Sequence, residues 1–173
     1  MLRLFLLRHA KSAWPDGIAD RDRPLAERGQ RGAAAIGAYM AANGLIPALA
    51  LVSPARRAIE TWDVATASWP PHAPPGFEEA IYEAPSEGLL ALIRRQDGRS
   101  PLLLVGHNPG LEGLAALLLK RAHRMQVLPK YPTGALAVID LPVGDWAAVK
   151  PGEGELERFV TPRALGVVKH DKD

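Results

Sequence analysis

Short apolar segments alternate with segments of helical composition along the first two thirds of this chain, and this alternation restricts the fold more than any other feature. The apolar segments are Leu2 to Leu7, ALALVS at 48–53 and PLLLV at 101–105, and each has the length of a buried strand. Between the first two, ERGQRGAAAIGAYMAA at 27–42 is rich in Ala and predicts a helix. Strands that alternate with helices predict an α/β fold: a three-layer α/β/α sandwich around a mostly parallel sheet.

The middle of the chain predicts two more helices and a loop between them. Pro54 fits the first turn of a helix that continues through ARRAIETWDVATAS at 55–68. The segment WPPHAPPG at 69–76 contains four prolines and a glycine, so we expect a loop without regular structure. Ser86 is a candidate N-cap for a helix that ends near Arg95.

The last third completes the predicted sandwich. LEGLAALLLKR at 111–121 predicts a helix, and GALAVIDL at 134–141 predicts a strand. DWAAVK at 145–150 and GELERFVT at 154–161, separated by a Pro-Gly turn, predict short strands that pair antiparallel at the edge of the sheet. The polar tail at 167–173 is expected to fray.

Composition excludes several classes of function. The 173 residues fit one domain, 1–173, and the formal charge of +2 is too balanced to indicate a nucleic-acid or membrane partner. The chain has no cysteine, which excludes disulfides, thiolate metal sites and a cysteine nucleophile. The first apolar segment is short and contains Arg3, so we expect neither a signal peptide nor a membrane-spanning helix there. We therefore expect a cytoplasmic protein.

Polar side chains follow each of the three predicted parallel strands. His9 follows the first, Arg56 and Arg57 follow the second, and His107 follows the third. Ligands of open parallel sheets bind in the crevice beyond the carboxyl ends of the strands. We therefore expect two imidazoles and at least two guanidiniums to meet in one crevice.

Such a cluster suits a phosphoryl group. The guanidinium is planar and always charged, and its donors match phosphate oxygens. A helix that starts at Asn108-Pro109 adds backbone N–H groups and the positive end of a dipole. An imidazole beside the bound phosphate can attack it, and its positive neighbours lower its pKa and stabilise the transferring group. This chemistry requires no metal or cofactor, and the five histidines lack a zinc-binding spacing.

These motifs resemble those of the histidine phosphatase superfamily, which has the phosphoglycerate-mutase-like fold. Four of them occur in the order typical of that family: LLRHAKS at 6–12, RPLAERG at 23–29, SPARRAIET at 53–61 and VGHNPG at 105–110. The short chain, the RHAKS form of the first motif and the late GELERFVTPRAL at 154–165 resemble the small SixA-type phosphohistidine phosphatases.

The resemblance implies a role for four residues. His9 would be the nucleophile that becomes phosphorylated, Arg8 and Arg57 would bind the phosphate, and His107 would donate a hydrogen bond to it. Arg57 is preferred to Arg56 because the family pattern places its arginine directly before Ala and four residues before Thr. Ala10 stands where the family usually has Gly.

Other candidates follow from the same resemblance. Larger relatives carry a glutamate that protonates the leaving group, and FEEAIYEAPSEG at 77–88 offers Glu78, Glu79, Glu83 and Glu87. Glu83 is preferred because it follows Ile-Tyr. Lys11 and Ser12 either line the phosphate pocket or begin an exposed loop, and Asn108 is a candidate for substrate binding. For Arg23, a salt bridge that ties its loop to the rest of the protein is the expected role.

The sequence thus predicts a metal-independent phosphatase that acts through a phosphohistidine intermediate. A phosphohistidine on another protein is the expected substrate, because no segment is long enough for a capping subdomain and a phosphoramidate needs no dedicated acid. The alternatives are a phosphatase of small phosphate esters or sugar phosphates, and a module that binds phosphorylated ligands without catalysis.

Overall fold

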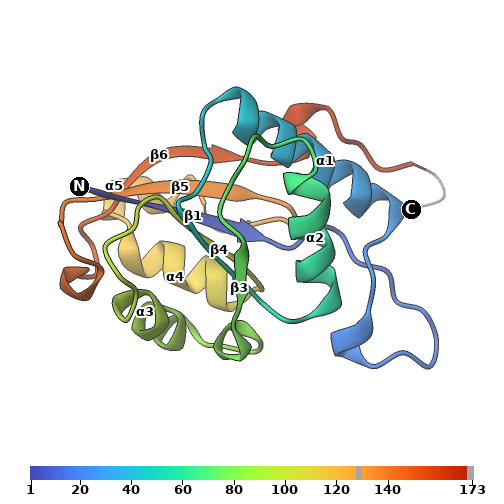
Figure 1. Ribbon diagram of the computed structural model, residues 1–173, viewed down its shortest axis with the longest axis horizontal. Helices are drawn as coiled ribbons and strands as arrows, with labels where there is room; N and C mark the ends of the chain where they lie inside the picture. Colours follow the sequence, from blue (N-terminus) through green and yellow to red (C-terminus); the bar gives the residue numbers. More distant parts are fainter. Residues whose placement is uncertain (128–129, 171–173) are drawn as a thin grey trace.

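The computed structural model describes residues 1–127 and 130–170, and within them a single mixed sheet lies at the centre (Figure 1). Its strand order is β3-β2-β4-β1-β5-β6. The strands are β1 (Leu2–Arg8), β2 (Leu49–Val52), β3 (Pro75–Phe77), β4 (Leu102–Gly106), β5 (Leu136–Leu141) and β6 (Glu155–Val160). β1 to β4 are mutually parallel, β5 is antiparallel to β1, and β6 is antiparallel to β5. The predicted mostly parallel sheet with an antiparallel edge is confirmed.

Helices cover both faces of the sheet. α1 (Glu27–Ala42) and α2 (Arg56–Thr66) lie on one face, and α3 (Ser86–Arg94) and α4 (Gly110–Leu118) lie on the other (Figure 1). Side chains alternate along β1, so that Leu4 and Leu6 join the core beneath α3 and α4. Phe5 and Leu7 join the core beneath α1 and α2. A strand that is apolar on both faces must have helices packed on each face, and this requirement produces the three layers of helix, sheet and helix.

Two predicted elements were wrong in kind. Residues 75 and 76, expected in the loop 69–76, belong to the edge strand β3, which lies beside β2. Pro75 is tolerated there because an edge strand needs backbone hydrogen bonds on one side alone. Residues 145–150 contain a 3₁₀ helix, Trp146–Ala148, and no strand. The Asp145 carboxylate accepts a hydrogen bond from the Ala147 N–H at 3.1 Å, which begins the turn and buries Trp146.

Helix ends also differ from the prediction in places. α1 has the expected bounds, but α2 begins at Arg56, so Pro54 lies before its first turn. Pro85, and not Ser86, occupies the N-cap position of α3. α4 ends at Leu118 because the chain becomes extended at Leu119, and the short α5 (Arg121–Arg124) follows.

No helix within the described residues has both the length and the apolar character needed to cross a bilayer. The expected fraying of the tail falls partly on 171–173, which lie outside the described residues.

Candidate active site

The two histidines meet where β1 and β4 end. Arg8 pairs with Gly106 in the parallel register, so His9 and His107 follow their strands at equivalent positions. The His9 N–H donates to the Gly106 carbonyl at 3.0 Å and fixes this register. The ring centroids of His9 and His107 lie 5.1 Å apart, with 52° between their planes. The convergence expected from the sequence is confirmed.

His9 is held in one tautomer. Its Nδ1–H donates to the carbonyl oxygen of Ala10 at 2.8 Å, which leaves the lone pair on Nε2. Only 7% of the residue is exposed, and burial lowers its pKa to about 3, with further lowering from His107, Arg57 and Arg8. His9 is therefore neutral at pH 7, with Nε2 available as a nucleophile.

The His107 ring forms a hydrogen bond with the residue that follows β2. Its Nε2 lies 2.7 Å from Oγ of Ser53, the buried residue that follows Val52. Its Nδ1 is buried and has no hydrogen-bond partner within 1–127 and 130–170. Burial, followed by the charge of Arg57, lowers the pKa of His107 to about 4.

Two arginines bring positive charge to the same place. Arg57, in the first turn of α2, is buried and donates from Nη1 to the Asp20 carbonyl at 2.8 Å and from Nη2 to the Asp20 carboxylate at 3.2 Å. Arg8 donates from Nη1 to the Tyr131 carbonyl at 3.0 Å, while its buried Nε has no partner among the described residues. Arg56 is exposed and pairs with Glu60 instead. The preference for Arg57 over Arg56 agrees with this geometry.

Thr61 links the segment after His9 to α2. Oγ1 of Thr61 accepts a hydrogen bond from the Ala10 N–H at 2.9 Å and donates to the Arg57 carbonyl at 2.7 Å. The backbone that follows His9 is thereby connected to the helix turn that carries Arg57.

Sequence reasoning missed a carboxylate that joins this cluster. Asp20 forms ion pairs with Arg57 and Arg23 and accepts a hydrogen bond from the Tyr82 hydroxyl. The Tyr82 hydrogen bond, followed by those from the two arginines, lowers the pKa of Asp20 to about 2. No local pattern pointed to the contacts of Asp20 with Arg57 and Tyr82, because they connect positions 37 and 62 residues apart.

The remaining predicted residues separate into two groups. A cavity of about 400 Å³ opens beside His107 and Arg57, and both Glu83 and Asn108 line it. Ser12 and Lys11 do not line that cavity: Ser12 is buried and accepts a hydrogen bond from Arg23, and Lys11 lines a second cavity.

Glu83 and Asn108 differ in how they are held. Glu83 is exposed and has a φ of 59°, a left-handed conformation that non-glycine residues seldom adopt. The other three candidate glutamates do not line the 400 Å³ cavity, and Glu79 pairs with Arg21. The Asn108 amide donates to the Tyr131 carbonyl at 3.0 Å, and its oxygen accepts from the Glu112 N–H at 3.2 Å.

Arg23 forms a salt bridge with Asp20 and also donates to Ala13 and Ser12, so it joins parts of the loop that precedes α1 to one another. The expected salt bridge is present, but it lies within the loop and does not tie the loop to the rest of the protein. No group of three or more His, Cys, Asp or Glu side chains among 1–127 and 130–170 is arranged to hold a metal ion.

Comparisons with known proteins agree with this geometry. The family model of the histidine phosphatase superfamily (branch 1) matches residues 4–89. The crystal structure of a protein named as the phosphohistidine phosphatase SixA from Agrobacterium tumefaciens covers 93% of this chain and 98% of its own, with 32% identity and a TM-score of 0.80. A structure of the protein histidine phosphatase SixA complexed with tungstate covers 95% of this chain and 99% of its own, with a TM-score of 0.75; at 22% identity it shows the fold alone.

The fold is the phosphoglycerate-mutase-like fold expected from the sequence motifs. A protein of Mycobacterium tuberculosis strain H37Rv, named as uncharacterised, is 40% identical over 165 residues, which are 91% of this chain and 100% of the relative. This identity over the relative's whole length, with the family-model match to the segment that contains His9 and Arg57, shows that the chain belongs to the histidine phosphatase superfamily.

Proposed function

We propose that this protein is a metal-independent phosphatase that forms a phosphohistidine intermediate on His9 and dephosphorylates phosphohistidine on another protein. Membership of the superfamily supports phosphatase activity. The observation that carries the mechanism is the state of His9: a buried, neutral ring with Nδ1–H bonded to the Ala10 carbonyl and a lone pair on Nε2.

In the first step, Nε2 of His9 attacks phosphorus, and the bond between phosphorus and the substrate's imidazole nitrogen breaks. The displaced imidazole leaves with the electron pair and takes a proton from solvent water. Arg8 and Arg57 stabilise the equatorial oxygens, and the unpartnered Nε–H of Arg8 is a donor available to them. In the second step, water attacks the phosphohistidine at position 9, which releases inorganic phosphate and restores the neutral ring.

The leaving group supports phosphohistidine as the substrate. A phosphoramidate nitrogen accepts a proton more readily than an ester oxygen, so transfer from it depends less on a protein acid. The segment 67–74 between α2 and β3 is short, and the crevice is lined by loop residues together with the first turns of α2 and α4. A side chain presented by another protein can therefore approach. A relative at 32% identity carries the name of a phosphohistidine phosphatase.

A specific observation favours small phosphate esters as a second candidate. Glu83 lines the crevice in a left-handed conformation, beside the cavity wall formed by His107. A carboxylic acid in that position could protonate an ester oxygen as it leaves.

Comparing substrates tests the proposal. Wild-type protein should hydrolyse a phosphohistidine-containing phosphocarrier protein and free phosphoramidate with a higher kcat/KM than a panel of sugar phosphates. Glu83→Gln should leave the phosphohistidine rate within about twofold, because that leaving group needs no acid. Glu87→Gln, outside the cavity, is the matched control. A wild-type preference for esters, with a loss of about a hundredfold on them in Glu83→Gln alone, would establish the second candidate instead.

A further inference from the structure

A second cavity, of about 590 Å³, lies along the same edge of the sheet as the crevice with His9. Ala10 and Lys11, directly after His9, form part of its wall. β6 runs in the same direction as β1, so the segment that follows Val160 reaches the same edge and forms another part. The cavity has the size of a ligand site and lies beside the crevice, with Ala10 and Lys11 next to the nucleophile.

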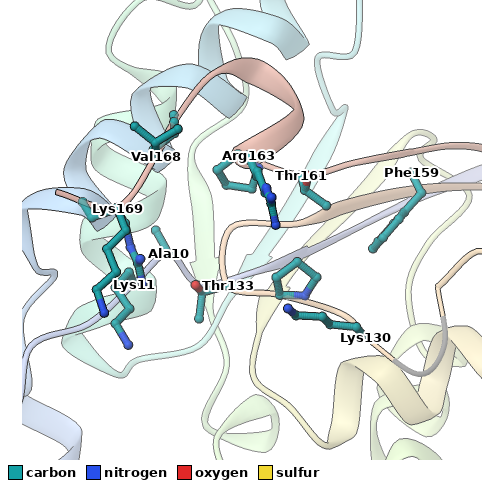
Figure 2. A pocket seen from close by; sticks show the side chains of 14 residues that line it. Ala10, Lys11, Lys130, Thr133, Phe159, Thr161, Arg163, Val168 and Lys169 are labelled. Carbon is teal, nitrogen blue, oxygen red and sulfur yellow. The ribbon is translucent and has the colours of Figure 1, made fainter. Parts of the chain in front are cut away.

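Every charged side chain that lines this cavity is basic. These side chains come from the segment after β1, from α1, from the loop before β5 and from the segment after β6, and they are Lys11, Arg28, Lys130, Arg163 and Lys169. In Figure 2, Lys11 and Lys169 extend on one side, Lys130 and Arg163 extend on the other, and Thr133 lies between them. The formal charge of the whole chain is +2, so this concentration of one sign is local.

These five side chains are unpaired within residues 1–127 and 130–170. In the part of the chain that the structure describes, none of them forms a hydrogen bond or an ion pair. Arg57, which lines the crevice, differs in this respect because it is paired with Asp20. Five unpaired cations around one concave surface create a positive potential that attracts an anionic ligand.

The backbone of the cavity wall is fixed to the backbone that carries the nucleophile. The Lys11 carbonyl accepts a hydrogen bond from the Ala26 N–H at 2.9 Å, and Gly29 packs so closely that an added Cβ would lie 1.9 Å from that oxygen. The Gly134 N–H donates to the His9 carbonyl at 3.0 Å. The position of the basic cavity relative to His9 is therefore set by the fold.

We propose that this basic cavity binds acidic side chains on the surface of the phosphorylated protein substrate while the phosphoryl group occupies the crevice. The inference rests on the proposed function. Lys130, Arg163 and Lys169 are exposed, so a surface loop or helix of another protein can reach them. Phe159 and Val168 add apolar wall that the methylene groups of Asp and Glu side chains can contact.

Reversal of charge at the cavity rim tests the inference. In Lys130→Glu/Arg163→Glu, KM for a phosphohistidine protein should rise on the order of tenfold or more, with kcat unchanged. Activity on free phosphoramidate should remain at the wild-type level, because neither residue lines the crevice. Raising the salt concentration should weaken the wild-type reaction with the protein substrate more than that of the variant.

The matched control is Arg121→Glu/Lys150→Glu, which makes the same charge change in α5 and after the 3₁₀ helix Trp146–Ala148. Equal KM values for the two double variants would overturn the inference, as would a loss on phosphoramidate. If Lys130→Glu/Arg163→Glu lost activity on fructose 1,6-bisphosphate and kept it on the phosphohistidine protein, the inference would also be overturned, and a small polyanionic substrate would be the ligand of the cavity. Failure of the proposed function looks different: wild-type protein would hydrolyse phosphoramidate or esters and leave the phosphohistidine protein intact.

Discussion

At the scale of single residues, the state of His9 is set by what surrounds it. A histidine beside a carboxylate usually gains a proton, but His9 is buried and has His107, Arg57 and Arg8 as its charged or ionisable neighbours. Burial and nearby positive charge both oppose protonation, so the rings of His9 and His107 stay neutral at a pH at which an exposed histidine would begin to gain a proton. The bond to the Ala10 carbonyl then determines which nitrogen is free to react.

The ring protons of His9 and His107 should not titrate between pH 8 and pH 5. The pKa values of about 3 and about 4 lie below the ordinary 6.5, so both rings remain neutral over that range. NMR titration of the histidine ring signals, assigned with His9→Asn and His107→Asn, measures this directly. A midpoint near 6.5 for either ring would contradict the account of its environment.

The same pKa values predict how stability changes with pH. Below pH 6.5 the unfolded chain binds protons at these two positions that the folded protein does not bind. The free energy of unfolding is therefore unaffected by these two histidines above pH 6.5. As the pH falls from 6.5 toward the pKa values of the folded protein, each histidine lowers the free energy of unfolding by up to about 1.4 kcal/mol per pH unit.

At the scale of elements, close backbone contacts determine where the segment after His9 and the helix that carries Arg57 lie. Gly29 in α1 lets the Lys11 carbonyl approach, and Gly37 in the same helix lets the Ala65 carbonyl of α2 approach. An added Cβ would lie 1.9 Å from the first oxygen and 2.0 Å from the second. The first contact supports the segment that follows His9, and the second supports the packing of two helices.

Gly29→Ala and Gly37→Ala should therefore have different effects on activity. Both should lower the free energy of unfolding by about 1–3 kcal/mol, because the clash outweighs the higher helix propensity of Ala. Gly29→Ala alone should also lower kcat, since Lys11 cannot move without moving the backbone of His9. Urea unfolding and steady-state kinetics measure the two effects. Gly98→Ala is the control, because a Cβ added at that position meets no atom within 4 Å. Equal kcat values in both helix variants would contradict this assignment.

At the scale of the whole molecule, short-range patterns predicted most of the architecture. Apolar strands and Ala-rich helices are recognisable locally, and α1 has the bounds expected from ERGQRGAAAIGAYMAA. The meeting of His9 with His107 followed from one rule about the edges of parallel sheets. The errors arose where tertiary contacts decide the outcome, as in β3, where Pro75 joins a sheet edge, and at Trp146, which is buried in a 3₁₀ helix.

The parts of the site that the sequence did not predict also depend on long-range contacts. Asp20 hydrogen-bonds to both Tyr82 and Arg57, and these three residues come from separate segments of the chain that only the fold brings together. The cations of the basic cavity likewise come from the segment after β1, from α1, from the loop before β5 and from the segment after β6, and none of these segments contains more than two of them. The arrangement of such residues is a property of the folded chain.

The central claim is that His9 carries the phosphoryl group during turnover. Rapid quench of the protein with ³²P-labelled phosphohistidine protein should trap phosphate on the enzyme that is stable to base and labile to acid. Peptide mapping should place the label at position 9, EDTA should leave the amount unchanged, and His9→Ala should carry none. Turnover without trapped label, or the same label in His9→Ala, would contradict the claim.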